Sequence, residues 1–217
     1  MSRDKVGTPG DDEYQSGSSG KVLRNKLGLT DPDRIALVES TLLAVAQPHS
    51  LGYFETDTLR TVSLLQVLRR SWLGSLYDFA GEIRKVNMSK GTVVFAPVAY
   101  LETTLNELDQ VFSSETPCQN MSKDRLALAL ARVHAELIPA HPFGEGNGRL
   151  ARWVANLMSL QAGFPALDWE FDVQPDERRG EYFSAFRHGS AMNFRPLEDL
   201  VSLAIERAVR LMEGPSA

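Results

Sequence analysis

The chain has 217 residues, of which 43% are hydrophobic and 24% are charged, and its formal net charge is -5. A chain of this length buries on the order of 70% of its unfolded surface, so one domain with short appendages is expected. The acidic balance provides no general basic field for nucleic acid. The single cysteine, Cys118, excludes an internal disulfide and a thiolate zinc site.

The N-terminal segment is rich in Gly, Ser and Asp and lacks the apolar core of a secretory signal. No apolar run in the sequence approaches the roughly 18 residues that cross a membrane. We therefore expect a cytoplasmic protein that contacts neither a membrane nor nucleic acid directly. Residues 1–20 are predicted to be a flexible tail, and residues 21–212 to be the folded domain.

The first elements are predicted to be helical. Residues 21–28 are expected to form a short helix that ends at a glycine. Thr30 or Asp31 then caps a helix that continues to residue 47. A further helix is predicted over residues 58–77, where leucine and tryptophan form an apolar stripe.

One β-hairpin follows. Val86 and Met88 alternate with polar residues, residues 89–91 are predicted to turn, and residues 92–95 are rich in β-forming side chains. Pro97 closes the hairpin. It is the only convincing hairpin in the sequence.

The rest of the sequence has helical periodicity and no internal repeat. The predicted helices cover residues 100–112, 122–137, 149–161, 176–191 and 196–213. The expected fold class is therefore mainly α, with one hairpin.

Residues 141–152 read HPFGEGNGRLAR and combine features of an anion site. The proline ends the preceding helix, and the three glycines allow tight backbone approach. A new helix begins within the motif, and its free N–H groups and positive dipole end attract anions. Arg149 and Arg152 are three residues apart, so they share a helix face, and two guanidinium groups suit a polyphosphate.

Two more residues of the motif indicate chemistry. Glu145 would repel a phosphate directly, but it suits Mg²⁺, which binds carboxylate and phosphate oxygens together. His141 can accept a proton at neutral pH. Each feature alone is more often structural, as a helix cap, a solvated helix face or a simple turn. Their occurrence together within one short stretch favours nucleotidyl or phosphoryl transfer.

The motif resembles the Fic signature H-P-F-x-(D/E)-G-N-G-R-x-x-R at every defined position. The stretch LYDFAGEIRKVNMSKGTVVFAP is similar to the family's helix end and target-binding hairpin, called the flap. DDEY and LRNKLGLTD resemble the start of the short bacterial Fic toxins that have antitoxin partners. The resemblance covers residues 11–210 and is strongest over residues 77–160. It implies a single helical Fic-type domain with the flap over the active-site loop.

The resemblance implies a protein adenylyltransferase, which transfers AMP from ATP to a hydroxyl side chain of a target protein and releases pyrophosphate. His141 would be the general base, Glu145 would bind Mg²⁺, and Phe143 would pack the loop onto the core. The residues implied to bind ATP are Gly146, Asn147, Gly148, Arg149, Arg152, Tyr182 and Asn193. The flap residues implied to align the target by strand addition are Lys85, Val86, Asn87, Met88, Ser89, Lys90, Gly91, Thr92, Val93, Val94 and Phe95.

The sequence departs from the family pattern at two places. Phe79 stands where many relatives carry tryptophan, and Arg69 where many carry histidine. Neither departure is expected to affect the chemistry.

Most Fic proteins are restrained by a helix with the motif (S/T)-x-x-x-E-(G/N), whose glutamate pairs with the second signature arginine, here Arg152. This sequence contains no full match, and the nearest approach, SLAIER, contains Glu206. The resemblance therefore implies that a small helical antitoxin carries the inhibitory glutamate. An internal brake at Glu206 and the lack of any brake are the alternatives. The resemblance also implies that the target is an ATPase subunit of a type II topoisomerase, DNA gyrase or topoisomerase IV.

Three alternatives remain. A Fic-fold protein with a different loop can act as a phosphotransferase or transfer another nucleotide. The Doc-type phosphotransferase has ANK where this chain has GNG, so Gly146 and Gly148 favour AMP transfer. A nucleotide-binding scaffold without catalysis would be expected to lack the motif's histidine, glutamate or asparagine, and all three are present. A metal hydrolase could use His134 and His141 as ligands, but no third ligand is evident.

Overall fold

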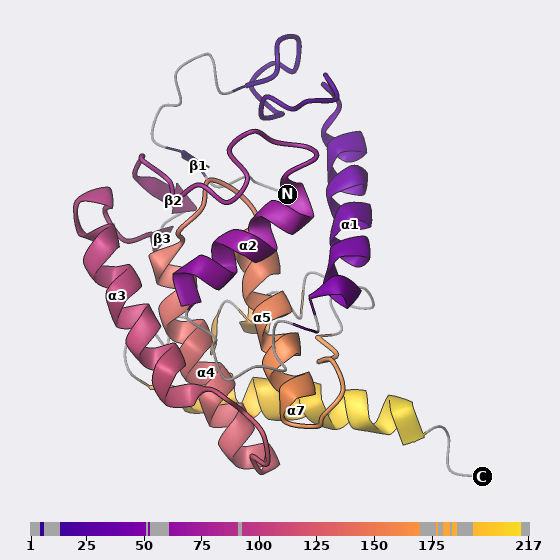
Figure 1. The fold of residues 1–217 in the computed structure, drawn as a ribbon, viewed down its shortest axis with the longest axis vertical. Helices are drawn as coiled ribbons and strands as arrows, with labels where there is room; N and C mark the ends of the chain where they lie inside the picture. Colours follow the sequence, from indigo (N-terminus) through magenta and orange to yellow (C-terminus); the bar gives the residue numbers. More distant parts are fainter. Residues whose placement is uncertain are drawn as a thin grey trace.

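A computed structural model describes residues 5–6, 14–50, 52, 61–90, 93–169, 177, 180–182, 184–185 and 193–213. The helices with stated bounds are α1 (Pro32–His49), α2 (Thr61–Leu73), α3 (Val98–Glu115), α4 (Lys123–Ala140), α5 (Asn147–Gln161) and α7 (Arg195–Glu213). The strands are β1 (Lys5–Val6), β2 (Met88–Lys90) and β3 (Val93–Val94). The predicted mainly α fold with a hairpin is confirmed (Figure 1).

Side-chain caps fix the starts of two helices. Asp31 caps α1, where its Oδ1 accepts hydrogen bonds from the backbone N–H groups of Asp33 and Arg34. Ser122 caps α4 in the same way, through the N–H of Arg125. Such caps satisfy N–H groups that have no partner inside the helix, so these starts could be located from the sequence.

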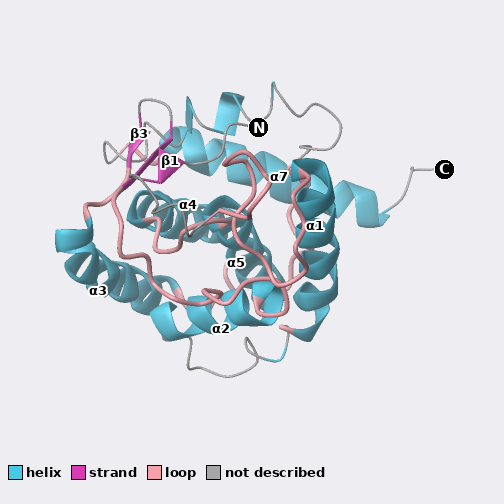
Figure 2. Ribbon diagram, turned by 90° about the horizontal axis from the view of Figure 1, so that it is seen from above, coloured by secondary structure: helices cyan, strands magenta, loops and turns pink. Residues whose placement is uncertain are grey.

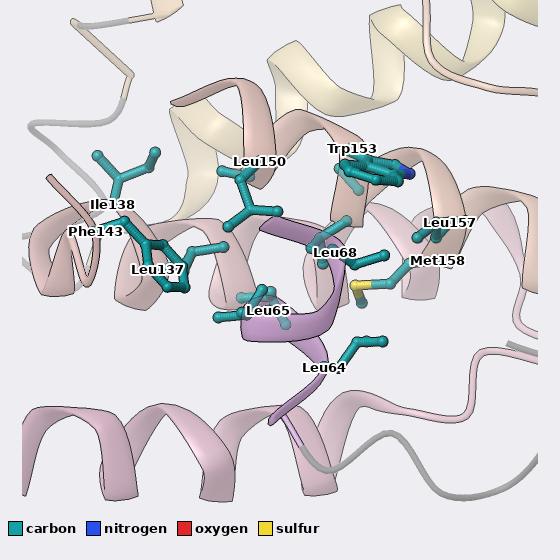
Figure 3. Close-up of a cluster of buried hydrophobic side chains, with 14 of the residues drawn as sticks. Leu64, Leu65, Leu68, Leu137, Ile138, Phe143, Leu150, Trp153, Leu157 and Met158 are labelled. Atoms are coloured by element: carbon teal, nitrogen blue, oxygen red, sulfur yellow. The ribbon is translucent and has the colours of Figure 1, made fainter. Parts of the chain in front are cut away.

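The core lies around α4 and α5, which the other helices surround (Figure 2). α4 packs against α3, α5 and α7, while α2 packs against α1, α3 and α5. The side chains that converge between α2, α4 and α5 in Figure 3 are Leu64, Leu65, Leu68, Leu137, Ile138, Phe143, Leu150, Trp153, Leu157 and Met158. Because α4 and α5 are both anchored in this core, the loop that joins them has two fixed ends.

The sheet lies at the end of the bundle where α4 ends and α5 begins (Figure 1). β2 pairs antiparallel with β3, with Ser89 opposite Val94 and Lys90 opposite Val93. The predicted turn at residues 89–91 is therefore wrong in part: Ser89 and Lys90 belong to β2, because pairing with the valines extends the strand. Gly91 and Thr92 lie outside the described residues.

β1 was not predicted, since it lies within the tail expected to be flexible. It pairs antiparallel with the other edge of β2, with Lys5 opposite Ser89 and Val6 opposite Met88. The boundaries at residues 20 and 212 stay predictions.

The short helix predicted over residues 21–28 is wrong. This segment forms turns and bends, with an isolated bridge between Tyr14 and Leu23. Asn25 explains the difference, because its side-chain amide donates to the carbonyl oxygens of Leu23 and Leu29 and its Oδ1 accepts from the N–H of Leu29. An asparagine that bonds its neighbouring backbone competes with the helical hydrogen-bond pattern.

Other boundaries differ by a few residues. α2 ends at Leu73, so the predicted helix ends too late, while α3 and α4 extend further than predicted. The helix predicted over residues 176–191 falls mostly outside the described part of the chain. None of the helices in the described part is both long and apolar enough to cross a bilayer.

Candidate active site

The loop between α4 and α5 is held by left-handed backbone at both ends. His141 ends α4 with φ 45° and ψ 57°, and Gly146 precedes α5 with φ 74° and ψ 10°. Asn147 closes the loop between them: its Oδ1 accepts from the N–H of Phe143 at 3.0 Å and its Nδ2 donates to the Phe143 carbonyl at 2.7 Å. The motif's asparagine therefore shapes the loop, a role that the resemblance did not imply.

Among the three glycines of the motif, Gly146 is the one at which an added Cβ would clash. A Cβ atom here would lie 2.6 Å from Nη1 of Arg69 and 2.9 Å from the ring of Trp72. The positive φ is also unfavourable for any side chain. The loop backbone thus lies directly on α2, and only glycine permits this approach.

The start of α5 can hold an anion. No side chain caps this helix at Gly146, so the dipole and the first-turn N–H groups are not neutralised by a capping side chain. The N–H of Gly146 itself donates to Oε1 of Glu145 at 2.9 Å. The predicted helix start within the motif is confirmed.

Arg149 is fixed by two carboxylates. Its Nη2 lies 2.6 Å from Oε2 of Glu39 and 3.4 Å from Oε1 of Glu145, and its guanidinium lies 4.7 Å from the centroid of the Trp72 ring. Glu39, buried on α1, also accepts a 2.6 Å hydrogen bond from the hydroxyl of Tyr77. A residue far from the motif thus orients its first arginine, which sequence reasoning missed.

Arg69 lies beneath the loop and is fully buried. Its guanidinium lies between two rings, 5.5 Å from the centroid of Trp72 and 5.3 Å from that of Phe143. None of its three nitrogens has a hydrogen-bond partner among the described residues. Burial lowers the pKa of Arg69 to about 10, so it stays charged at neutral pH.

The sequence contained a signal for this buried cation. Arg69 follows Leu65 by four residues and precedes Trp72 by three, so it lies on the apolar stripe of its helix. A charged residue on such a stripe indicates a buried charge. The expectation that arginine at position 69 does not affect the chemistry was made without this spacing, and it stays a prediction.

His141 lies between its own helix and the flap. Its Nδ1 is 3.2 Å from the carbonyl oxygen of Ile138, and the side chain is buried. Phe95, just after β3, stacks on the imidazole with ring centroids 3.5 Å apart. Arg84, before the flap, donates from Nε to the His141 carbonyl at 2.6 Å.

The flap residues do not all face the same way. Met88 and Phe95 are buried, whereas Lys85, Asn87 and Val94 are exposed. Target binding by the flap stays a prediction.

The two residues assigned to adenosine lie outside the motif. Tyr182 is buried, and its hydroxyl is 2.8 Å from Nε2 of His134. Asn193 is exposed, just before α7. Neither position tests the adenosine assignment, which stays a prediction.

His134 is a core residue. Burial, followed by the charge of Arg152, lowers its pKa to about 3, so the ring is neutral at ordinary pH. Among the described residues, no three His, Cys, Asp or Glu side chains are grouped closely enough to hold a metal ion. The structure therefore provides no support for a metal hydrolase based on His134 and His141.

Glu206, the nearest approach to an internal inhibitory glutamate, lies on α7. Its Oε1 is 2.5 Å from Nζ of Lys123, at the start of α4. It is therefore engaged by a lysine at the opposite end of α4 from the loop.

Residues 59–159 match the Fic/DOC family model. The chain is 24% identical over 203 residues to the protein adenylyltransferase VbhT of Bartonella schoenbuchensis, covering 94% of this chain and 42% of that protein. It is 29% identical over 150 residues to the probable protein adenylyltransferase Fic of Salmonella typhimurium, covering 69% and 72%. The chain thus spans less than half of the first relative's length.

Solved structures share the fold. The BepC protein of Bartonella tribocorum with bound AMPPNP has a TM-score of 0.69 at 19% identity, with 88% of this chain and 95% of that chain covered. A Fic domain of Bartonella quintana with bound ADP has a TM-score of 0.70 at 20% identity, with 88% and 93% covered. The family match, the shared fold and the motif at the junction of α4 and α5 agree: residues 59–159 match a Fic/DOC domain, and the described chain has the fold of solved Fic domains.

Proposed function

We propose that this protein is an adenylyltransferase that transfers AMP from ATP to a hydroxyl side chain of a target protein. The observation that carries the proposal is the junction of α4 and α5, where a buried histidine ends α4 and an uncapped helix start with two arginines in its first turns begins α5. The relatives named as protein adenylyltransferases support the same activity.

ATP would bind with its phosphates at the start of α5. The backbone N–H groups after Gly146 and the guanidinium groups of Arg149 and Arg152 supply the donors. Both carboxylate contacts of Arg149 use Nη2. Glu39 can therefore hold this side chain while the other N–H groups of the guanidinium face a phosphate. Tyr182 and Asn193 are proposed to border the adenosine.

Glu145 fits a magnesium site. Mg²⁺ is usually held by one or two carboxylates together with phosphate oxygens and water, and Glu145 is the carboxylate in the loop, with its side chain 20% exposed. When bound, the ion would neutralise part of the charge on the triphosphate.

His141 is proposed to be the general base. If Nδ1–H donates to the Ile138 carbonyl, Nε2 is the nitrogen that can accept a proton. The target's hydroxyl oxygen then bonds to the α-phosphorus, its proton passes to Nε2, and the bond from the α-phosphorus to the bridging oxygen breaks. Pyrophosphate leaves with the electron pair of that bond.

The flap is proposed to align the target chain by strand addition. β2 is paired with β3 on one edge and with β1 on the other, so the target would add at an outer edge or replace β1. From the family resemblance, we propose that the target is an ATPase subunit of DNA gyrase or topoisomerase IV, in the cytoplasm.

We also propose that a small helical antitoxin restrains the enzyme through a glutamate that pairs with Arg152. The lack of a full inhibitory motif in the sequence supports a separate partner. Expression of the chain alone should then arrest growth, and both His141→Ala and co-expression of the partner should relieve it. Arrest by His141→Ala would contradict the toxin role.

Labelled ATP tests the proposed reaction. The protein is incubated with a bacterial extract and ATP labelled on either the α- or the γ-phosphate, with His141→Ala as the control. Label from the α-phosphate on a protein supports AMP transfer. Label from the γ-phosphate alone would indicate a phosphotransferase, and ATP binding without labelled protein would indicate a non-catalytic scaffold.

A further inference from the structure

Neighbouring residues of the flap face opposite environments. Val94 is 75% exposed, whereas Phe95 is 5% exposed. This alternation follows from the pleat of a strand, in which successive side chains point to opposite faces. The backbone N–H of Phe95 still donates to the Met88 carbonyl at 3.1 Å, so the residue belongs to the hairpin even though its ring points inward.

The ring of Phe95 lies flat on the imidazole of His141. The two centroids are 3.5 Å apart and the planes differ by 12°. At this separation the rings are in van der Waals contact, so the imidazole cannot tilt unless Phe95 moves. The contact of Nδ1 with the Ile138 carbonyl, at 3.2 Å, restrains rotation within the ring plane.

Arg84 fastens the flap to the loop. Its guanidinium donates to the carbonyl oxygens of Ala140 and His141 on the loop side, and to those of Val86 and Ala96 on the flap side. One planar donor group thus joins both ends of the flap to the end of α4.

Two backbone hydrogen bonds reinforce this link. The N–H of Arg84 donates to the Pro142 carbonyl and the N–H of Ala96 donates to the Pro139 carbonyl, both at 2.9 Å. The hairpin and the catalytic histidine are therefore parts of one packed unit.

We propose that Phe95 is a positioning residue for His141, which holds the imidazole in the plane required for proton transfer. The inference rests on the proposed function, because it assigns Phe95 a part in the same reaction. It separates two tasks between neighbouring flap residues: Val94 faces the target, and Phe95 faces the base. The flap is thereby part of the catalytic apparatus as well as a docking surface.

Substitutions at Phe95 and Val94 should change different kinetic constants, kcat for the first and KM for the second. Phe95→Leu keeps a buried apolar side chain but removes the flat ring, so kcat should fall about ten- to a hundredfold, as misplaced catalytic groups do. The KM for the modified target should change less than about twofold, while Val94→Ala should raise that KM and leave kcat nearly unchanged. The affinity for ADP should be the same in both variants.

Phe112→Leu is the matched control. Phe112 is a fully buried phenylalanine of α3, so the same substitution there removes the same atoms from the core. Both variants should unfold at a lower temperature, but only Phe95→Leu should lose kcat. An equal kcat in the two phenylalanine variants, or a Phe95→Leu defect confined to KM, would overturn the proposal.

An NMR measurement tests the stacking without any transferase activity. The chain has 4 histidines, so the ring signals of His141 can be assigned by comparison with His141→Ala. A stacked phenylalanine shifts these signals upfield, and Phe95→Leu should remove the shift while Phe112→Leu keeps it. If the wild type transfers no AMP, the proposed function fails, but an upfield shift that persists in Phe95→Leu would independently refute the positioning contact.

Discussion

The loop between α4 and α5 and the side chains that hold it in place come from differently arranged parts of the sequence. The groups proposed to do chemistry come from one continuous stretch, residues 141–152. The groups that hold them come from distant segments: Glu39 on α1, Arg69 on α2, and Arg84 and Phe95 around the flap. A local motif can therefore indicate a reaction, whereas the precise geometry of the site depends on tertiary contacts that no local pattern records.

Removal of the proposed base from the loop should have the largest effect. His141→Ala should slow AMP transfer by roughly 10²–10⁴-fold, because the proposed general base is lost. ADP affinity should barely change, since the start of α5 and the arginines hold the phosphates. Rate assays with α-labelled ATP and calorimetry with ADP measure the two effects. A variant that keeps most of its rate would show that the loop does not use this histidine.

A methyl group added at Gly146, between the loop and α2, should have the next largest effect, on stability. Gly146→Ala forces a Cβ against Arg69 and Trp72 at positive φ, which should lower the free energy of unfolding by about 2–4 kcal/mol. Gly144→Ala is the control, because a Cβ there meets nothing within 4 Å. Denaturant unfolding of both variants tests the contrast, and equal stability would mean that the loop is not pressed onto α2.

The buried His134 of α4 should make the free energy of unfolding depend on pH. The pKa of His134 is lowered to about 3, so between this value and the ordinary value near 6.5 the unfolded chain binds more protons than the folded one. Stability should therefore fall as the pH drops below 6.5, by about 2 kcal/mol at pH 5. His134→Gln should flatten this dependence in denaturant unfolding at pH 7 and pH 5. If His134→Gln leaves the pH dependence of stability unchanged, a group other than His134 causes it.

The smallest expected effect concerns the buried cation. Arg69→Met keeps most of the volume but removes the positive charge beneath the anion-binding loop, so ADP should bind about tenfold more weakly. Stability should hold or rise, because an unpaired buried charge is costly. Arg70→Met, at the exposed neighbour on the same helix, should change neither quantity. If ADP binding is unaffected in Arg69→Met, the cation serves packing alone.

Much of the fold followed from local signals. Asp31 and Ser122 start their helices as caps, and the apolar periodicities of α4, α5 and α7 place them correctly. The failures have tertiary or side-chain causes. Asn25 bonds its own backbone and prevents a helix, and β1 exists only because β2 offers it an edge.

The candidate site likewise combines features that local sequence predicts with tertiary contacts that it does not. The loop and its helix start were predicted because the residues are contiguous. The ion pair between Glu39 and Arg149 joins two helices more than a hundred positions apart, and no spacing rule links them. The stack of Phe95 on His141 depends on where the flap folds back. Of the residues that support the loop, only Arg69 could be recognised from the sequence, as a charged residue on the apolar stripe of its helix.

The most direct test of the central claim is mass spectrometry of host proteins after expression of the chain, with His141→Ala expressed in parallel. We expect a protein that carries one AMP on a hydroxyl side chain in the first culture and none in the second. The same modification in both cultures, or a protein that carries only phosphate, would contradict it.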